Sequence, residues 1–88
     1  MSEQKEGERY FLDITGETCP MTFVRTRLML DRIPAGALLT VRLKGREPLN
    51  GVPRSAAALG HAVLAREPES PDHAMPSDVW LVTLRKTG

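Results

Sequence analysis

Residues 10–24 read YFLDITGETCPMTFV, and this stretch decides the fold. Apolar side chains alternate through Tyr10, Leu12 and Ile14, which is the pattern of a half-buried strand. The polar residues 15–18 then form a turn. The sequence after the Cys-Pro pair favours a helix, because proline is tolerated in a first helical turn, where its missing N–H is not needed. The stretch therefore predicts a strand, a turn and a helix in direct succession.

The rest of the chain extends this order to β-α-β-α-β-β. Pro34-Ala35-Gly36 ends the first helix. The elements predicted after it are a strand at 39–44, a loop at 45–51, a short helix at 52–59, a strand at 61–66, a long flexible loop at 68–78 and a strand at 79–84. Pro53 falls in the first turn of this second helix, where it can be accommodated.

Two helices can cover only one face of a four-stranded sheet. The order therefore predicts an α/β (α+β) two-layer sandwich, βαβαββ, with a four-stranded mixed sheet and two helices on one face. We expect residues 1–9 to form a disordered N-terminal tail and residues 10–88 to form a single domain.

Composition narrows the class of protein. The chain has 88 residues, 41% of them apolar, with 12 basic against 11 acidic residues and a formal net charge of +1. This balance argues against a nucleic-acid partner, which usually demands a strong basic excess. No apolar run resembles a secretion signal or a membrane span, and one cysteine cannot form an internal disulfide. These features predict a cytoplasmic protein that does not bind membranes, and we expect a monomer.

Cys19 is the only cysteine, and it falls at or next to the start of the first helix. Free N–H groups and the helix dipole at such a position stabilise an anion, and they lower the pKa of a thiol. The alternative is a buried cysteine that acts as a small hydrophobe, which composition alone would favour. Its place after a polar turn and before Pro20 favours an exposed, reactive thiol instead.

The sequence resembles the TusA/SirA-like sulfur-carrier (sulfurtransferase) family. The similarity begins with residues 12–20, LDITGETCP, and continues through Pro34-Ala35-Gly36 with the strand after it, Glu47-Pro48 and Gly60-His61. It implies the same βαβαββ sandwich. It also implies that Cys19 is the catalytic residue, which accepts sulfane sulfur as a persulfide. The partners implied are a sulfur donor, of the cysteine desulfurase or rhodanese type, and a sulfur-acceptor protein, with no cofactor.

Two positions depart from the family pattern. Thr22 replaces the second proline of the family's Cys-Pro-x-Pro, and its hydroxyl could cap the helix or contact the sulfur. Gly51 replaces an aspartate before the second helix, where glycine remains an acceptable N-cap. The resemblance implies a sulfur-transfer carrier rather than a stand-alone enzyme, and these departures indicate a divergent member of the family. They also leave open a non-catalytic regulatory or protein-binding module on the same fold.

The first helix carries two apolar stripes. The stripe expected to face the sheet consists of Phe23, Thr26, Leu30 and Ile33. The second consists of Met21, Val24 and Leu28, flanked by Arg25. It predicts either a partner-binding surface or a face packed against the 68–78 loop.

Other side chains complete the predicted site. Pro20, Thr22 and Arg46 are expected to support Cys19, and Arg46 is chosen because its loop follows the second strand on the cysteine's side of the sheet. His61 and His73 lack the spacing of metal ligands, so no metal is expected.

Overall fold

The computed structural model describes residues 9–18, 20–70 and 78–87. Cys19, His73, residues 1–8 of the predicted tail and most of the predicted 68–78 loop lie outside the described residues. The elements are, in chain order, β1 (Arg9–Asp13), α2 (Met21–Arg32), β2 (Leu38–Lys44), α3 (Arg46–Ala58), β3 (Ala62–Pro68) and β4 (Val79–Arg85).

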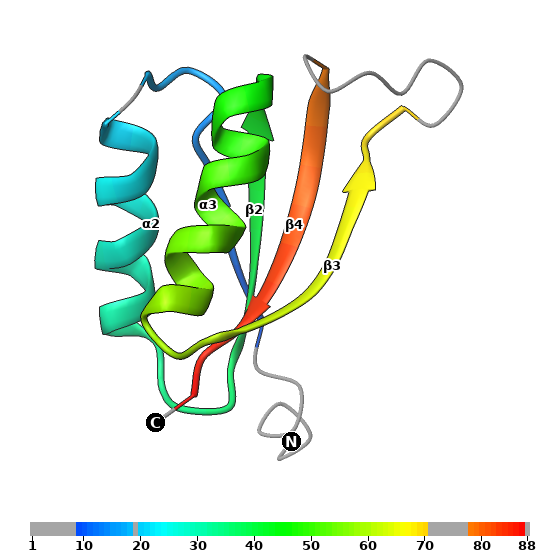
Figure 1. Ribbon diagram of the computed structural model, residues 1–88. Coiled ribbons are helices and arrows are strands. Elements are labelled where there is room, and N and C mark those ends of the chain that lie inside the picture. Colours follow the sequence, from blue (N-terminus) through cyan, green and yellow to red (C-terminus); the bar gives the residue numbers. More distant parts are fainter. Residues whose placement is uncertain (1–8, 19, 71–77, 88) are drawn as a thin grey trace.

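The four strands form one mixed sheet in the order β1-β2-β4-β3. β1 pairs with β2 in parallel, whereas β4 runs antiparallel to both β2 and β3. Both helices cover the same face of this sheet, and both begin at the edge where β1 and β2 end (Figure 1). The predicted two-layer sandwich is confirmed.

The core lies between the helices and the sheet. Strand alternation places Leu39, Val41 and Leu43 of β2 on the helical side, where they are fully buried. Val82 and Leu84 of β4 lie beside them, since the register pairs Val41 with Val82 and Leu39 with Leu84. The opposite face of the sheet carries no helix, and we call it the open face.

α2 buries the stripe that periodicity predicts. Thr26, Leu30 and Ile33 are buried against the core, and Phe23 packs half-buried beside them. The helix ends where the Nζ of Lys86 donates hydrogen bonds to the carbonyl oxygens of Leu30 and Ile33. A cation at a helix C-terminus satisfies free carbonyls and complements the helix dipole.

The second helix is longer than predicted. α3 begins at Arg46, so the loop expected at 45–51 is wrong. Gly45, with φ +111°, lets the chain turn into the helix, and its carbonyl accepts the N–H of Leu49 at 3.2 Å. Pro48 lies in the first turn of this helix, where a missing N–H costs nothing.

Two further predictions about α3 are corrected. Gly51 is not an N-cap but lies inside the helix, where a Cβ would stand 2.7 Å from ring atoms of Phe23. Glycine therefore allows α2 and α3 to approach closely at this point. Pro53 also lies inside the helix rather than in its first turn. It removes the N–H that would normally bond to the Leu49 carbonyl.

Candidate functional site

The candidate site lies at the edge of the sheet where α2 and α3 begin. Pro20 is the N-cap residue of α2, so Cys19 directly precedes the cap in the sequence. The start of α3 follows the neighbouring parallel strand and reaches the same edge (Figure 1). Ligand sites of α/β sheets commonly occupy this edge, at the carboxyl ends of the strands.

The backbone N–H groups in the first turn of α2 are not free to bind an anion as the sequence predicts. The N–H groups of Met21 and Thr22 donate to the Thr18 carbonyl at 2.7 and 3.3 Å. Those of Phe23 and Val24 both donate to the Pro20 carbonyl at 3.1 Å. The expectation of free N–H groups at this helix start is therefore wrong for these four residues. The helix dipole is the contribution that remains for stabilising a nearby anion.

The turn before Cys19 is held at both of its ends. Asp13 Oδ1 accepts hydrogen bonds from the backbone N–H and the hydroxyl of Thr15, at 2.9 and 2.7 Å. The Glu17 N–H closes a turn onto the Ile14 carbonyl at 3.0 Å. Glu17 also forms an ion pair of 2.8 Å with Arg25 in α2. Asp13 and Glu17 thus act within the turn, and Arg25 is already engaged by this chain's own carboxylate.

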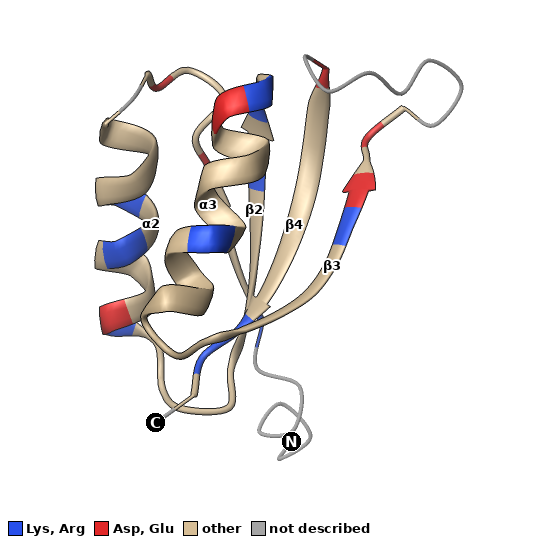
Figure 2. Ribbon diagram, viewed as in Figure 1, with Lys and Arg blue, Asp and Glu red and all other residues tan. Residues whose placement is uncertain are grey.

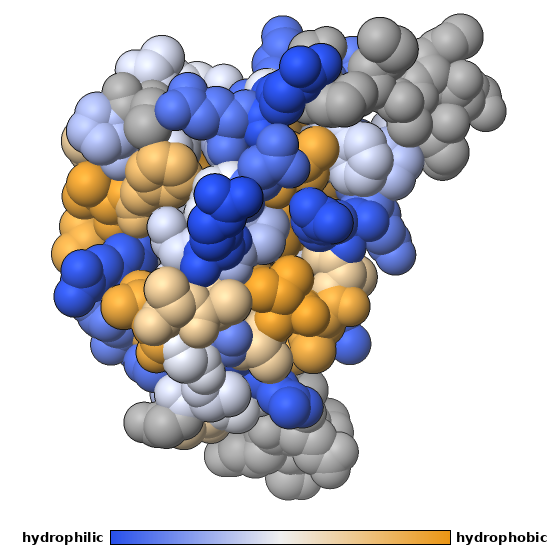
Figure 3. Space-filling view, viewed as in Figure 1, coloured by the Kyte–Doolittle hydropathy of each residue, from blue (hydrophilic) through white to orange (hydrophobic). Residues whose placement is uncertain are grey.

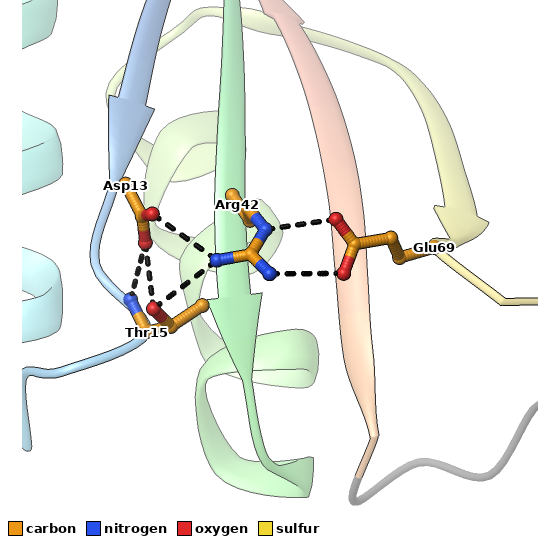
Figure 4. Close-up of polar contacts among 4 residues, drawn as sticks. All are labelled: Asp13, Thr15, Arg42 and Glu69. Carbon is orange, nitrogen blue, oxygen red and sulfur yellow. Dashed lines mark hydrogen bonds and ion pairs between the residues drawn. The ribbon is translucent and has the colours of Figure 1, made fainter.

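A guanidinium on the open face links this turn to the end of β3 (Figure 4). Arg42 donates to Asp13 Oδ2 at 3.1 Å, and through Nε and Nη2 it contacts both carboxylate oxygens of Glu69, at 2.9 and 3.0 Å. The Arg42 hydrogen bonds hold the pKa of Glu69 below its ordinary value. The pKa of Asp13 is lowered mainly by the Thr15 backbone N–H, then by the Thr15 hydroxyl, with Arg42 adding a smaller effect. The two carboxylates in turn raise the pKa of Arg42.

Thr22 lies beneath the start of α2 rather than on its surface. Its side chain is 2% exposed, and its hydroxyl oxygen makes no hydrogen bond to any residue that the structure describes. Thr26, one turn later and also buried, donates its hydroxyl to the Thr22 carbonyl at 2.8 Å. A capping bond from a side chain is absent at the described part of this helix start. Contact of the Thr22 hydroxyl with the cysteine sulfur stays a prediction.

Arg46 lies at the predicted edge, although it belongs to the first turn of α3 and not to a loop. It lines an open hollow of about 570 Å³ between the two helices, together with Phe23, Glu47, Asn50, Gly51 and Arg54. Basic residues occur near the start and the middle of α3 and along α2 (Figure 2). The structure therefore brings Arg46 and the first turn of α2 to one hollow.

The second stripe of α2 is exposed. Met21, Val24 and Leu28 are 43%, 41% and 57% exposed. The alternative that they pack against the 68–78 loop concerns a segment that lies largely outside the described residues. They do not line a single hollow. Val24 borders one of about 340 Å³ facing α3, while Leu28 and Arg25 border another of about 190 Å³ facing β1. Figure 3 shows hydrophobic patches separated by hydrophilic side chains over the helical face. The stripe is a ridge available to a partner.

Arg42 and Glu69 are not among the site residues predicted from the sequence. The alternation of side chains along each strand could have placed Arg42 and Asp13 on the same face of the sheet. Glu69 could not have been added, because it follows β3 at the far side of the sheet.

Within residues 9–18, 20–70 and 78–87, no group of three His, Cys, Asp or Glu side chains is placed to hold a metal ion. Among these described residues, neither α2 nor α3 has the length and apolar composition of a membrane-spanning helix.

The fold and this edge define a class of protein: a small βαβαββ sandwich with a Cys-Pro pair at the start of its first helix. A family profile described as "Sulfurtransferase TusA" matches residues 10–86. The chain therefore belongs to the TusA sulfurtransferase family. A protein of Archaeoglobus fulgidus named "Putative sulfur carrier protein" is 43% identical over 56 residues. That alignment spans 64% of this chain and 64% of the relative's length.

Proposed function

We propose that the protein is a cytoplasmic sulfur carrier that holds sulfane sulfur as a persulfide on Cys19. The single observation that carries this proposal is the family match across residues 10–86, which includes the Cys-Pro pair. The name of the Archaeoglobus fulgidus relative points the same way. The placement of α2 supports it further, because the helix dipole favours an anionic sulfur near its start.

The chemistry is a pair of exchanges. The Cys19 thiolate attacks the outer sulfur of a donor persulfide. The sulfur–sulfur bond of the donor breaks, and the donor cysteine leaves as a thiolate. An acceptor thiolate then attacks the outer sulfur on Cys19 in the same manner, and Cys19 is released as a thiolate. Sulfur keeps its oxidation state throughout, so the relay needs no oxidant and no cofactor.

The donor in this proposal is a cysteine desulfurase or a rhodanese-type protein, and the acceptor is a second protein. Both meet the carrier, as a monomer, at the edge where α2 and α3 begin. Met21, Val24 and Leu28 supply exposed apolar contact there, and aromatic or aliphatic anchors of a partner can bury against such a ridge. Arg46 adds positive charge that draws an acidic partner surface. Arg25 borders the ridge as well, although its charge is paired with Glu17 at 2.8 Å.

The test is the intact mass of the protein. Incubation with a cysteine desulfurase and cysteine, or with inorganic polysulfide, should add about 32 Da per sulfur, and dithiothreitol should remove it. Cys19→Ser should show no addition. If the wild-type protein gains no sulfur from any of these donors under non-reducing conditions, the proposal is wrong.

A second candidate is a regulatory or protein-binding module that kept the fold without the relay. The observation that favours it is the first turn of α2, where the N–H groups of Met21 and Thr22 already bond to the Thr18 carbonyl. A thiol with fewer available donors would keep an ordinary pKa. Titration of the thiolate by its ultraviolet absorbance distinguishes the two candidates: a lowered pKa with fast alkylation supports the carrier, whereas an ordinary pKa with slow alkylation supports the module.

A further inference from the structure

Two side chains of opposite charge lie on either side of Cys19 in the sequence and meet in the fold. Glu17 comes two residues before the cysteine, and Arg25 lies in α2, six residues after it. Nη1 of Arg25 donates a hydrogen bond to Oε2 of Glu17 at 2.8 Å. The ion pair therefore joins the turn to the helix across the segment that contains the cysteine.

The backbone holds Glu17 in place independently of this ion pair. Its N–H donates to the Ile14 carbonyl at 3.0 Å, which closes the turn. The carbonyl of the next residue, Thr18, accepts the N–H of Met21 at 2.7 Å, so the chain before the cysteine is also bonded to the first turn of α2. Loss of the guanidinium would therefore leave the Glu17 backbone where it is.

An unpaired carboxylate at position 17 would oppose ionisation of the thiol. Two residues of chain span at most about 7 Å, so Glu17 and Cys19 stay close in any conformation. A nearby negative charge favours the neutral form of a thiol and lowers the thiolate fraction. The N–H groups of residues 21–24 cannot offset this charge, because they are bonded to the carbonyls of Thr18 and Pro20. Arg25 is the side chain that neutralises Glu17.

The other charges at this edge belong to other elements and are mixed in sign. The described ones are Asp13, Arg42, Lys44, Arg46, Glu47, Glu69 and Asp78. Each basic side chain of this set lies beside an acidic one: Arg42 bonds Asp13 and Glu69, Lys44 shares a hollow with Asp78, and Arg46 directly precedes Glu47. Removal of one partner of the ion pair in the turn would instead leave a single charge on the same segment as the cysteine.

We propose that Arg25 is a positioning residue for sulfur transfer, which pairs with Glu17 and so keeps the Cys19 thiolate populated. The inference rests on the proposed function, because it gives Arg25 a part in the step in which the thiolate attacks a donor persulfide. Without Arg25, the Glu17 carboxylate repels the thiolate. Without Glu17, the free guanidinium attracts it. The two substitutions therefore change the acidity of the thiol in opposite directions.

A purely structural role of the ion pair would give a different pattern. If the pair only held the turn against α2, loss of either partner would disturb the cysteine in the same way. The side chains of Arg25 and Glu17 are 43% and 30% exposed, so solvent weakens the field of each charge and salt screens it. The electrostatic role therefore predicts shifts that are small, opposite in sign and abolished by salt.

The rate of alkylation by iodoacetamide as a function of pH tests this assignment, because the chain has a single cysteine and the rate follows its thiolate. At about 10 mM ionic strength, the midpoint should rise by roughly 0.3–0.6 pH units in Arg25→Met, as expected for one unit charge about 8 Å away, and fall by a similar amount in Glu17→Gln. Arg25→Lys and the double variant Arg25→Met/Glu17→Gln should stay near the wild-type midpoint. In about 1 M salt all the midpoints should converge.

Arg32→Met is the matched control, because Arg32 is an exposed arginine at the other end of α2 and its loss changes the net charge equally. Its midpoint should equal that of the wild type. Shifts of the same sign in Arg25→Met and Glu17→Gln, or a double variant displaced as far as Arg25→Met, would show that the pair is a structural tether and overturn the proposal. An equal shift in the control, or no shift in either single variant, would overturn it as well.

Loading by inorganic polysulfide separates this proposal from the proposed function. At pH 7 the added mass should accumulate up to roughly twofold more slowly in Arg25→Met and faster in Glu17→Gln, because the rate follows the thiolate fraction and nucleophilicity offsets only part of the change. Alkylation needs no sulfur donor. Opposite midpoint shifts in a protein that gains no sulfur would therefore overturn the carrier function and still support the electrostatic role of Arg25.

Discussion

A single guanidinium sets the electrostatics of the open face near the site. Arg42 bonds Asp13 at the end of β1 and Glu69 at the end of β3, and it therefore ties two segments that are remote in the sequence. All three side chains remain partly exposed, so solvent and salt weaken the pairing. The network therefore fixes the positions of the two strand ends relative to each other and contributes little to stability.

The two carboxylates of this network should respond differently to loss of Arg42. In Arg42→Met, the pKa of Glu69 should return to near its ordinary 4.5, because Arg42 is the main cause of its lowering. The pKa of Asp13 should stay below 3.8, because the Thr15 backbone N–H is the larger cause there. NMR titration of the carboxyl carbons measures both. Arg66→Met is the control and should move neither; equal shifts of Asp13 and Glu69 would contradict this account.

The lowered pKa values of Asp13 and Glu69 determine how the stability changes in acid. A carboxyl whose pKa is lower in the folded state contributes stability that is complete above its unfolded pKa and is lost as pH falls through the folded value. The contribution of Asp13 and Glu69 is therefore present at neutral pH and disappears below their ordinary values of 3.8 and 4.5. In Arg42→Met, the free energy of unfolding should therefore fall less between neutral pH and pH 3.8 than it does in the wild type. Unfolding curves measured at both pH values test this.

Two buried threonines in α2 offer a matched comparison. Thr22→Val should raise the free energy of unfolding by about 1 kcal/mol, because it removes a buried hydroxyl that has no partner among the described residues. Thr26→Val should lower it by about 1 kcal/mol, because that hydroxyl donates to the Thr22 carbonyl. Guanidinium unfolding with unchanged m-values measures both. An equal loss in Thr22→Val would show that its hydroxyl is bonded outside the described part of the chain.

At the scale of elements, the contact between α2 and α3 depends on Gly51. A glycine inside a helix costs roughly 0.5–1 kcal/mol relative to alanine, so its position requires a compensating contact. Phe23 provides it, because its ring occupies the space that a Cβ at position 51 would need. The ring also lines the hollow that contains Arg46, so this packing shapes the candidate site.

Gly51→Ala should therefore destabilise the protein by about 1 kcal/mol, because overpacking exceeds the gain in helix propensity. In a Phe23→Leu background, which lacks the ring atoms at 2.7 Å, the same substitution should instead stabilise. Thermal unfolding of the four proteins of this cycle measures the reversal. Asn50→Ala, on the exposed side of α3, controls for helix propensity and should stabilise by about 0.5 kcal/mol in both backgrounds. Absence of a sign change at position 51 would contradict the steric explanation.

At the scale of the whole molecule, the parallel pairing of β1 and β2 creates the candidate site. Each of these strands is followed by a helix, and the two helix starts meet at one edge. Arg46 and the first turn of α2 are brought together in this way, although more than twenty residues separate them. β1 begins and β4 ends at the opposite edge (Figure 1).

Arg46→Glu should therefore affect transfer from a protein donor and not the thiol itself. We expect KM for loading by a cysteine desulfurase to rise roughly threefold to tenfold, because a charge at the contact edge changes association most. Loading by inorganic polysulfide should keep its rate, since it needs no docking. Arg32→Glu, at the other end of α2, is the matched control. An equal rise in the control would assign the effect to net charge rather than to the edge.

The sequence by itself determined the order of the elements, the two-layer sandwich, the buried stripe of α2 and the family. These follow from local alternation and helical periodicity, which depend on neighbours within a few residues, and from the motif around residues 12–20. It misplaced the start of α3, because Pro48 and Gly51 each disfavour a helix in isolation. Pro48 is tolerated because it lies in the first turn, and Gly51 fits because the Phe23 ring occupies the space that a Cβ would need. Only the tertiary structure decided the Arg42 network, which joins the ends of β1 and β3 across β2. This network depends on which strands lie side by side, and strand order is set by packing across the sheet rather than by any local pattern.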